Sequence, residues 1–302
     1  MNKAVKYRLY PTTEQKIMFV KTFGCCRKVY NLMLADKIAC YKKTKSFGKQ
    51  TPAMYKAEYP FLKEVDSLAL ANVQLNLQSA LKNCFDKSRK RQNGFPKFKS
   101  AKHSRKSYTT NNQKGTVAII DDRYIKLPKI GKIKAVIHRK PDADWTIKSA
   151  TISQDSDGKF YVSILFEYEK AITPAIISDN AVGIDYKSDG LYMDSNGYCP
   201  FGHKYYRQNQ EKLAQAQRKL KHMAIGSNNY KKQQCKIAKI QKHTSNQRLD
   251  FLHKESTKIT NLYDIVCVET LDMKAMSNKA FGNGKATMDN GYGMFLNMLE
   301  YK

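Results

Sequence analysis

The stretch AVGIDYKSDGLYMD, residues 181–194, decides how the second half of the chain folds. Its apolar start predicts a short strand that ends at the carboxylate of Asp185, and residues 186–189 predict a turn. A second strand follows over residues 190–194, and the dipeptide Asn196-Gly197 after it is a strong hairpin signal. An aspartate at a strand end either caps the turn or serves as a ligand, and this stretch alone leaves both open.

A second carboxylate stands in the same kind of position further along the chain. Residues 264–269 read DIVCVE, whose apolar run predicts a strand that is buried on both faces and ends at Glu269. In an RNase H-like sheet these two strands are neighbours, so Asp185 and Glu269 would meet at one edge. Convergent carboxylates can hold Mg²⁺, and paired metal ions activate water and stabilise the leaving oxygen of a phosphodiester.

The charge balance points to a polyanionic partner. The 302 residues include 54 Lys and Arg against 26 Asp and Glu, a net charge of +28. Nucleic acid is the default partner for such an excess, and an anionic membrane surface is the competitor, although no long basic amphipathic helix stands out. No apolar run could span a bilayer and the N-terminus lacks a signal-peptide core, so we expect a cytoplasmic protein of two or three domains.

The N-terminal half predicts one strand, three helices and then short strands. Residues 4–10 alternate like a strand, and the pattern T-x-x-Q at Thr12 and Gln15 predicts a capped helix to about residue 23. Further helices are expected over residues 25–41 and 66–91. The expected buried stripe of the last helix is Leu68, Ala71, Leu75, Leu81 and Phe85. Strands expected over residues 117–120, 124–127, 132–138, 149–154 and 160–168 suggest a small β-barrel, which the strand at 4–10 could complete.

Two segments concentrate the positive charge. Residues 87–106 carry nine Lys or Arg and no acid, and they include the interleaved run GFPKFK at 94–99. Rings between cations can stack on bases while the cations meet phosphates, although a solvated linker would have the same charge. Residues 204–248 carry twelve basic residues and one acid, and their apolar spacing predicts an antiparallel helical hairpin with basic outer faces.

The seven cysteines are scattered and form no C-x-x-C pair. A disulfide framework or a zinc ribbon is therefore not expected, and buried reduced thiols are the simpler interpretation.

Taken together, these motifs resemble those of the TnpB family of insertion-sequence-encoded proteins, which is related to the effector nucleases of type V CRISPR systems. The matching motifs follow the family order along nearly the whole chain. They are YRLYP at 7–11 with Gln15, CRKVYN at 26–31, GFPKFK at 94–99, LPKIG at 127–131, GID at 183–185, VETL at 268–271, and FL at 295–296 with LEYK at 299–302. Tyr186 stands where Thr or Gly is typical of the family, which we interpret as variation within it.

The resemblance implies an α+β multidomain fold. A β-barrel wedge domain (residues 1–10 and 107–170) would carry an inserted helical recognition region with a helix-turn-helix-like start (11–106). An incomplete RuvC-like, RNase H-like α/β domain would follow at 181–302. The implied activity is RNA-guided, Mg²⁺-dependent DNA cleavage, with Asp185 and Glu269 as catalytic metal ligands. The implied partners are a guide RNA from the element end, double-stranded target DNA and a transposase of the same element. The implied location is the cytoplasm of a prokaryote, where the protein would associate with the nucleoid.

The positive clusters and their aromatic residues supply the candidates for nucleic-acid binding. These are Arg8, Arg27, Lys87, Arg89, Lys90, Arg91, Phe95, Lys97, Phe98, Lys99, Lys102, Arg105, Lys106, Lys204, Arg207, Lys231, Lys232 and Lys239.

Two family features are missing from the sequence. The family pattern continues with a zinc ribbon of two C-x-x-C pairs, which would bind Zn²⁺, and a third catalytic Asp, whereas this sequence stops at Lys302. We therefore expect a truncated form with little or no cutting, because losing one ligand of an interdependent set removes most of the rate. The last helix would also leave Met294, Phe295, Met298 and Leu299 without their expected cover.

Two other functions compete with a truncated endonuclease. One is a nuclease-dead, RNA-guided DNA-binding repressor, and the other is a basic RNA-binding protein without a DNA target. The ordered motifs disfavour the second.

Overall fold

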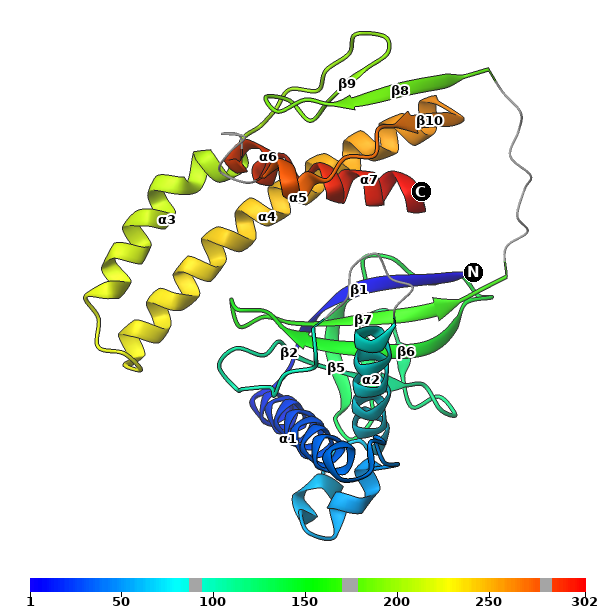
Figure 1. Cartoon of the computed structure of the whole chain (residues 1–302), viewed down its shortest axis with the longest axis vertical. Coiled ribbons are helices and arrows are strands. Elements are labelled where there is room, and N and C mark those ends of the chain that lie inside the picture. The colour runs from blue at the N-terminus through cyan, green and yellow to red at the C-terminus, as the bar shows by residue number, and fades with distance from the viewer. Residues whose placement is uncertain (87–93, 170–178, 278–283) are drawn as a thin grey trace. The chain divides into compact units, whose positions relative to one another are not determined.

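The computed structural model describes residues 1–86, 94–169, 179–277 and 284–302 (Figure 1). The chain divides into two compact units, Met1–Ala171 and Ile172–Lys302. We call them unit 1 and unit 2 and describe each by itself. The sequence predicts a linker between them at residues 171–180, most of which lie outside the described ranges.

Unit 1 combines helices with one antiparallel sheet. Its elements are β1 (Asn2–Tyr10), α1 (Thr13–Thr44), 3₁₀ helices at Pro52–Lys56 and Pro60–Lys63, α2 (Ser67–Phe85), β2 (Lys106–Asn111), β3 (Ala118–Ile120), β4 (Tyr124–Leu127), β5 (Gly131–Val136), β6 (Thr146–Gln154) and β7 (Phe160–Glu167). The five strands predicted after residue 117 are confirmed within a few residues, and β2 is an additional strand.

The sheet of unit 1 has its first strand near the middle. The strand order is β2-β6-β7-β1-β5-β4-β3, and β1 pairs antiparallel with both β7 and β5. Side chains of β1 alternate as the sequence predicts, with Val5, Tyr7 and Leu9 buried. Among the described strands β2 and β3 are the edges, so the predicted barrel is a curled, open half-barrel (Figure 1).

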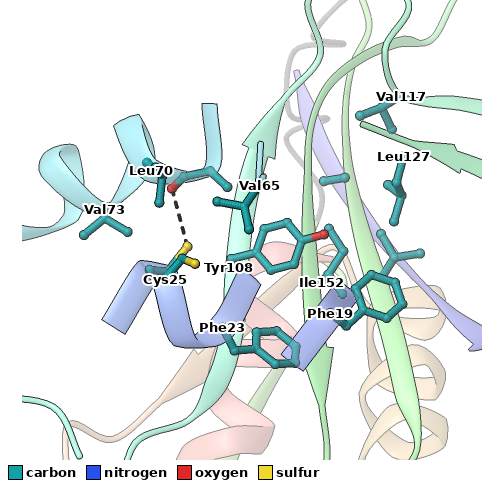
Figure 2. Packing of buried hydrophobic residues seen from close by; sticks show 14 of the residues in the cluster. Phe19, Phe23, Cys25, Val65, Leu70, Val73, Tyr108, Val117, Leu127 and Ile152 are labelled. Carbon is teal, nitrogen blue, oxygen red and sulfur yellow. Dashed lines mark hydrogen bonds between the residues drawn. The ribbon is translucent and has the colours of Figure 1, made fainter. Parts of the chain in front are cut away.

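Helices α1 and α2 pack against the β2 side of this sheet. Phe19 and Phe23 of α1 point toward Tyr108 of β2, with ring centroids 6.5 and 5.8 Å away (Figure 2). The Cys26 thiol donates a 3.9 Å hydrogen bond to the Ala69 carbonyl of α2. Burial raises the pKa of Tyr108, which stays protonated in this core.

Helix α1 is one continuous helix, so the predicted break between residues 23 and 25 is wrong. The capping box is confirmed: the Thr12 hydroxyl accepts from Gln15 N–H, and the Gln15 side chain accepts from Thr12 N–H. Gly24 lies inside the helix, and a glycine costs a helix about 1 kcal/mol without breaking it. Buried neighbours on both sides, Phe23 and Cys25 among them, compensate for that cost.

Helix α2 begins as predicted and ends earlier. The Asp66 carboxylate caps it by accepting from Leu68 N–H at 3.1 Å, and its other oxygen accepts from the Thr110 hydroxyl. The last helical residue is Phe85 rather than 91. Of the predicted stripe only Leu81 is buried. The buried face is instead Ala69, Leu70, Val73, Leu77 and Leu81. Apolar residues occur on several faces of this helix, so periodicity alone did not select the right one.

The described residues of unit 2 form a three-stranded sheet, a long helical hairpin and three short helices. Its elements are β8 (Ala181–Tyr186), β9 (Tyr192–Asp194), α3 (Tyr205–Lys221), α4 (Asn228–Leu262), β10 (Ile265–Val268), α5 (Met273–Met276), α6 (Gly284–Asn290) and α7 (Tyr292–Tyr301). The sheet order is β10-β8-β9. Helices α3 and α4 form the predicted antiparallel hairpin, in which α4 extends to residue 262 (Figure 1).

Two burial predictions for unit 2 are wrong. Strand β10 is largely exposed, with Ile265 and Val268 each 44% exposed, because among the described strands it forms one edge of the small sheet. Helix α7 is covered rather than bare: Phe295 and Met298 are buried in a core with Tyr192, Leu252 and Ile259. Strand β9 and helix α4 supply that cover. Met294 is the most exposed member of the predicted face, at 40%.

All seven cysteines are free thiols, of which Cys25 and Cys26 are buried. No helix in the described ranges is long and apolar enough to cross a bilayer.

Candidate functional site

The sheet of unit 2 brings Asp185 and Glu269 side by side. Strands β8 and β10 are parallel, and their register pairs Val266 with Val182 and Val268 with Ile184. Asp185 and Glu269 are the next residues of the two strands, at the same end. Neighbouring strands lie about 4.8 Å apart, so the two backbones hold these residues next to each other. The predicted pairing of these strands is confirmed.

The loop after β9 uses a different carboxylate for structure. One Asp194 oxygen accepts from the backbone N–H groups of Asn196 and Tyr198, at 3.0 and 2.7 Å. Gly197 takes φ +82°, and its N–H donates to the Asp194 carbonyl. A turn therefore forms at Asn196-Gly197, but the next described element is a helix rather than a strand, so the dipeptide closes no hairpin. Asp194 serves the turn, whereas both Asp185 and Glu269 are exposed.

A buried tyrosine lies within the electrostatic reach of the carboxylate pair. Tyr292, at the start of α7, is 0% exposed, and its hydroxyl has no hydrogen-bond partner among the described residues. Burial, and then the charges of Asp185 and Glu269, raise the pKa of Tyr292 to about 12. Its hydroxyl therefore stays protonated at neutral pH and is available as a donor. No sequence motif had singled it out.

The donor set fits a single hard divalent cation. Mg²⁺ in proteins commonly uses one or two carboxylates and completes its shell with water and substrate phosphate oxygens. Exposed carboxylates on adjacent strand ends provide the protein part of such a shell. Within the described ranges, no group of three or more His, Cys, Asp or Glu side chains is placed to hold a metal ion.

In unit 1 the basic segment at residues 94–99 is tied to α1. The Asn31 side chain donates to the Lys99 carbonyl at 2.9 Å and accepts from Lys99 N–H at 2.8 Å. The Lys99 ammonium lies 3.9 Å from the centroid of the Tyr30 ring, a cation–π contact. Phe95 and Phe98 are 41% and 59% exposed, so their rings are accessible for stacking.

Four of the predicted nucleic-acid-binding residues line one cavity. It has a volume of about 110 Å³ and lies among α1, α2 and the chain from residue 99 to 109. Its basic lining residues are Arg27, Lys99, Arg105 and Lys106. Asn72, Asn76 and Thr109 add neutral hydrogen-bonding groups. Cations grouped in this way suit a phosphate group.

The other predicted nucleic-acid-binding residues lie elsewhere. The Arg8 guanidinium stacks on Tyr10 and Tyr161 at 4.9 and 5.9 Å, and its buried Nε has no hydrogen-bond partner among the described residues. Lys97 and Lys102 are exposed in unit 1. Lys204, Arg207, Lys231, Lys232 and Lys239 are exposed in unit 2, on or next to α3 and α4. Lys87, Arg89, Lys90 and Arg91 lie outside the described residues.

A buried carboxylate that the sequence did not reveal fixes the start of α3. Asp289 accepts from Tyr206 N–H at 2.9 and 3.1 Å and from Arg207 N–H at 3.4 Å. It also accepts from Arg248 of α4 at 3.1 Å, and its side chain is 1% exposed. Lys204, in the N-cap position, makes no capping hydrogen bond, so Asp289 takes over that role from more than 80 residues away.

Two family models match the chain. One, described as "Helix-turn-helix domain", matches residues 1–46, which here form β1 and the single helix α1. The other, described as "Probable transposase", matches residues 163–280.

Two relatives match nearly the whole of this chain. A "Putative RNA-guided DNA endonuclease" of Streptomyces pristinaespiralis is 33% identical over 324 residues, which cover 100% of this chain and 75% of the relative. InsQ of Escherichia coli (strain K12), with the same description, is 31% identical over 93% of this chain and 69% of its own length. A chain in the "Cryo-EM structure of the Cas12f1-sgRNA-target DNA complex" matches with a TM-score of 0.56 over 100% of this chain and 86% of its own. At 12% identity, that last match shows the fold alone.

The ordered motifs, both family models and the two long relatives agree, and the chain belongs to the TnpB family of insertion-sequence-encoded proteins.

Proposed function

We propose that this chain is an RNA-guided DNA-binding protein with a RuvC-like nuclease site at Asp185 and Glu269. The observation that carries the proposal is the parallel register of β8 and β10, which sets both carboxylates at the same end of adjacent strands. The names of the two long relatives support the substrate class. The excess of 28 positive charges supports a nucleic-acid partner.

In this proposal Asp185 and Glu269 hold a divalent cation, Mg²⁺ in the first place. When bound, such a cation supplies Lewis-acid stabilisation of charge on the scissile phosphate. The Lys and Arg side chains of α3 and α4 neutralise backbone phosphates of the bound DNA or RNA and contribute the salt-dependent part of the affinity for nucleic acid. Phe95 and Phe98 provide stacking surfaces that do not depend on base identity.

The two units take different tasks. The sheet formed by residues 1–10 and 107–170 would act as the wedge domain and residues 11–106 as the recognition region. The cavity lined by Arg27, Lys99, Arg105 and Lys106 would contact the nucleic-acid backbone. Residues 181–302 would act as the nuclease domain. Nucleoid association follows from DNA binding, and a transposase of the same element stays a predicted partner.

We propose further that cutting by this chain alone is weak. Two carboxylates suffice for one Mg²⁺, but a two-metal site needs additional ligands to fix both ions in line with the phosphate. The same donor set favours a second candidate function, an RNA-guided DNA-binding repressor that does not cut.

A plasmid assay separates these functions. The chain is purified with RNA from its flanking element and mixed with supercoiled plasmid that carries a matching target, with Mg²⁺ or with EDTA. Weak, Mg²⁺-dependent nicking that Asp185→Ala abolishes supports the nuclease. Guide-dependent binding without nicking supports the repressor.

The control variant is Asp250→Ala, which changes an exposed carboxylate of α4 whose ion-pair partner is Lys254. It should behave like the unmodified chain. Nicking that survives Asp185→Ala would overturn the assignment of the metal site. Binding that falls with salt but ignores the guide sequence would overturn RNA guidance.

A further inference from the structure

Four aromatic rings form a continuous cluster near the C-terminal ends of α1 and α2. The Tyr41 ring of α1 stacks on Phe47, with centroids 4.8 Å apart and ring planes inclined by 19°. Phe47 contacts Phe85, the last residue of α2, at 5.5 Å, and Phe85 contacts Phe95 at 6.4 Å. Tyr41, Phe85 and Phe95 are 41%, 53% and 41% exposed. Exposed apolar surface gathered in one place marks an interaction site, and we call these four rings the aromatic platform.

A buried lysine fixes the segment that carries Phe47. Lys37 is 4% exposed. Its ammonium group donates to the carbonyls of Phe47 and Gly48, at 3.2 and 3.1 Å, and to the Gln50 side-chain oxygen at 3.3 Å. A buried charge is costly unless it is fully hydrogen-bonded, and these acceptors use all three N–H groups of the lysine. Gly48 takes φ +20°, and a Cβ there would lie 2.4 Å from the Gln50 side chain. The ring of Phe47 is therefore positioned before any partner arrives, which lowers the entropy lost on binding.

The aromatic platform lies beside a run of cations. Residues 41–49 read YKKTKSFGK, with four lysines and no acid. All four lysines are exposed: Lys42, Lys43, Lys45 and Lys49. The Lys45 ammonium lies 5.9 Å from the centroid of the Tyr41 ring. Rings among cations complement unpaired nucleotides, because bases stack on the rings while phosphates meet the cations. An uncharged apolar partner would cover the rings but leave the lysines without counter-charge.

We propose that the aromatic platform stacks unpaired bases of single-stranded RNA, and that Lys42, Lys43 and Lys45 contact the adjacent phosphates. The inference deepens the proposed function and rests on its nucleic-acid binding rather than on the carboxylate pair. In that function the target DNA is a duplex, whose bases are already stacked on one another. RNA presents unpaired bases in loops, bulges and ends, so it is the partner that fits the rings.

The test measures the fluorescence anisotropy of a labelled single-stranded RNA of about 12 nucleotides, a length within the site sizes of single-strand binders. The full chain is compared with Tyr41→Leu and Phe85→Leu, which remove a ring but keep an apolar side chain. We expect each change to weaken binding of the single strand about fivefold or more. Binding of the matching RNA duplex should stay within about twofold, because paired bases cannot reach the rings.

Phe61→Leu is the matched control, because Phe61 is an exposed ring of unit 1, at 44%, that lies outside the platform. It should bind the single-stranded RNA like the unmodified chain. A further variant replaces Lys42, Lys43 and Lys45 together by glutamine. It should lower the slope of log Kd against log salt by about 0.7 for each lysine. Tyr41→Leu and Phe85→Leu should leave that slope unchanged, which separates stacking from charge.

Four results would overturn the proposal. If Tyr41→Leu and Phe85→Leu bind the single-stranded RNA like the unmodified chain, the platform takes no base, although the proposed function stands. If the two variants weaken only a DNA single strand of the same sequence, the occupant is DNA. If light scattering shows a dimer of the unmodified chain that Phe85→Leu turns into a monomer, the platform is an interface between two copies. If the unmodified chain binds none of these nucleic acids, the proposed function fails and the role of the platform fails with it.

Discussion

Replacing Asp289 by alanine should destabilise unit 2 far more than the loss of one surface charge would. The carboxylate is 1% exposed and satisfies two backbone N–H groups at the start of α3 as well as the Arg248 guanidinium. Removing one partner of a buried ion pair costs about 3–5 kcal/mol. Arg248 is 20% exposed, and water that reaches its guanidinium reduces that cost. The lost cap adds about 1 kcal/mol. We therefore expect a loss of about 3 kcal/mol.

The assay uses urea unfolding followed with two signals. Trp145, the only tryptophan, lies in unit 1 and reports on that unit by fluorescence. Circular dichroism at 222 nm sums the helices of both units, α1 and α2 as well as α3 and α4, so the part of its change that does not coincide with the Trp145 transition reports on unit 2. With a urea slope of about 2 kcal/mol per M, the helical transition should move down by about 1.5 M. The Trp145 transition should not move.

Asp250→Ala is the control, since it removes only an exposed i,i+4 pair with Lys254, a kind of pair that contributes little to stability. If Asp289→Ala shifts the helical transition no more than this control does, the buried cap does not hold the start of α3 as argued. A shift of the Trp145 transition by the same amount would show that the effect is not local to unit 2.

Three further predictions concern single features. Gly291→Ala should lower the free energy of unfolding by about 1–2 kcal/mol in the same urea experiment, because residue 291 takes φ +69° and a Cβ there would lie 3.1 Å from a side chain of α4. The control is Gly293→Ala: a Cβ at residue 293 would have nothing within 4 Å, so this change should be neutral or slightly stabilising. The folded-state pKa of Tyr292, about 12 and raised mainly by burial, exceeds the unfolded value of about 10, so stability should be complete below pH 10 and fall as the pH rises toward 12. Urea midpoints measured from pH 8 to 11.5 should fall less steeply in Tyr292→Phe, and equal slopes would contradict the assignment. Asn31→Ala should release residues 94–99, which its two hydrogen bonds to Lys99 hold against α1, so trypsin should cleave this segment faster. The free energy of unfolding that Trp145 reports should fall by no more than about 1–2 kcal/mol. Unchanged cleavage would contradict the proposed role of these hydrogen bonds.

Local signals in the sequence were sufficient for many elements. The capping box at Thr12 and Gln15 and the turn at Asn196-Gly197 each depend on residues a few positions apart, and both are present in the structure. Motif order also led to the correct family, and the apolar runs before Asp185 and Glu269 identified two strands that are indeed neighbours.

Features that depend on distant parts of the chain were missed. From the sequence alone, Gly24 predicts a break between two helices. The helix continues through it because residues on both sides of Gly24 are buried against the rest of unit 1. The run at β10 reads as a buried strand, but which of its faces is covered depends on neighbouring elements rather than on its own residues. Asp289 and Tyr292 belong to no motif, and their partners lie about 20 to 110 residues earlier in the chain. Composition and spacing carry no information about such contacts.

The central place of β1 in its sheet sets the order in which unit 1 is completed during synthesis. Asn2 pairs with Glu167, and Leu9 with Phe160, so most of the first strand has no partner until the last strand of its sheet has been made. At about 5–20 residues per second, roughly ten to thirty seconds separate their appearance at the ribosome. Meanwhile α1 and α2 can form from local contacts. The lone strand carries Lys3, Lys6 and Arg8 between its apolar residues, and such charges discourage pairing with other nascent chains. These charges thus protect the N-terminus until its partner strand β7 has been made.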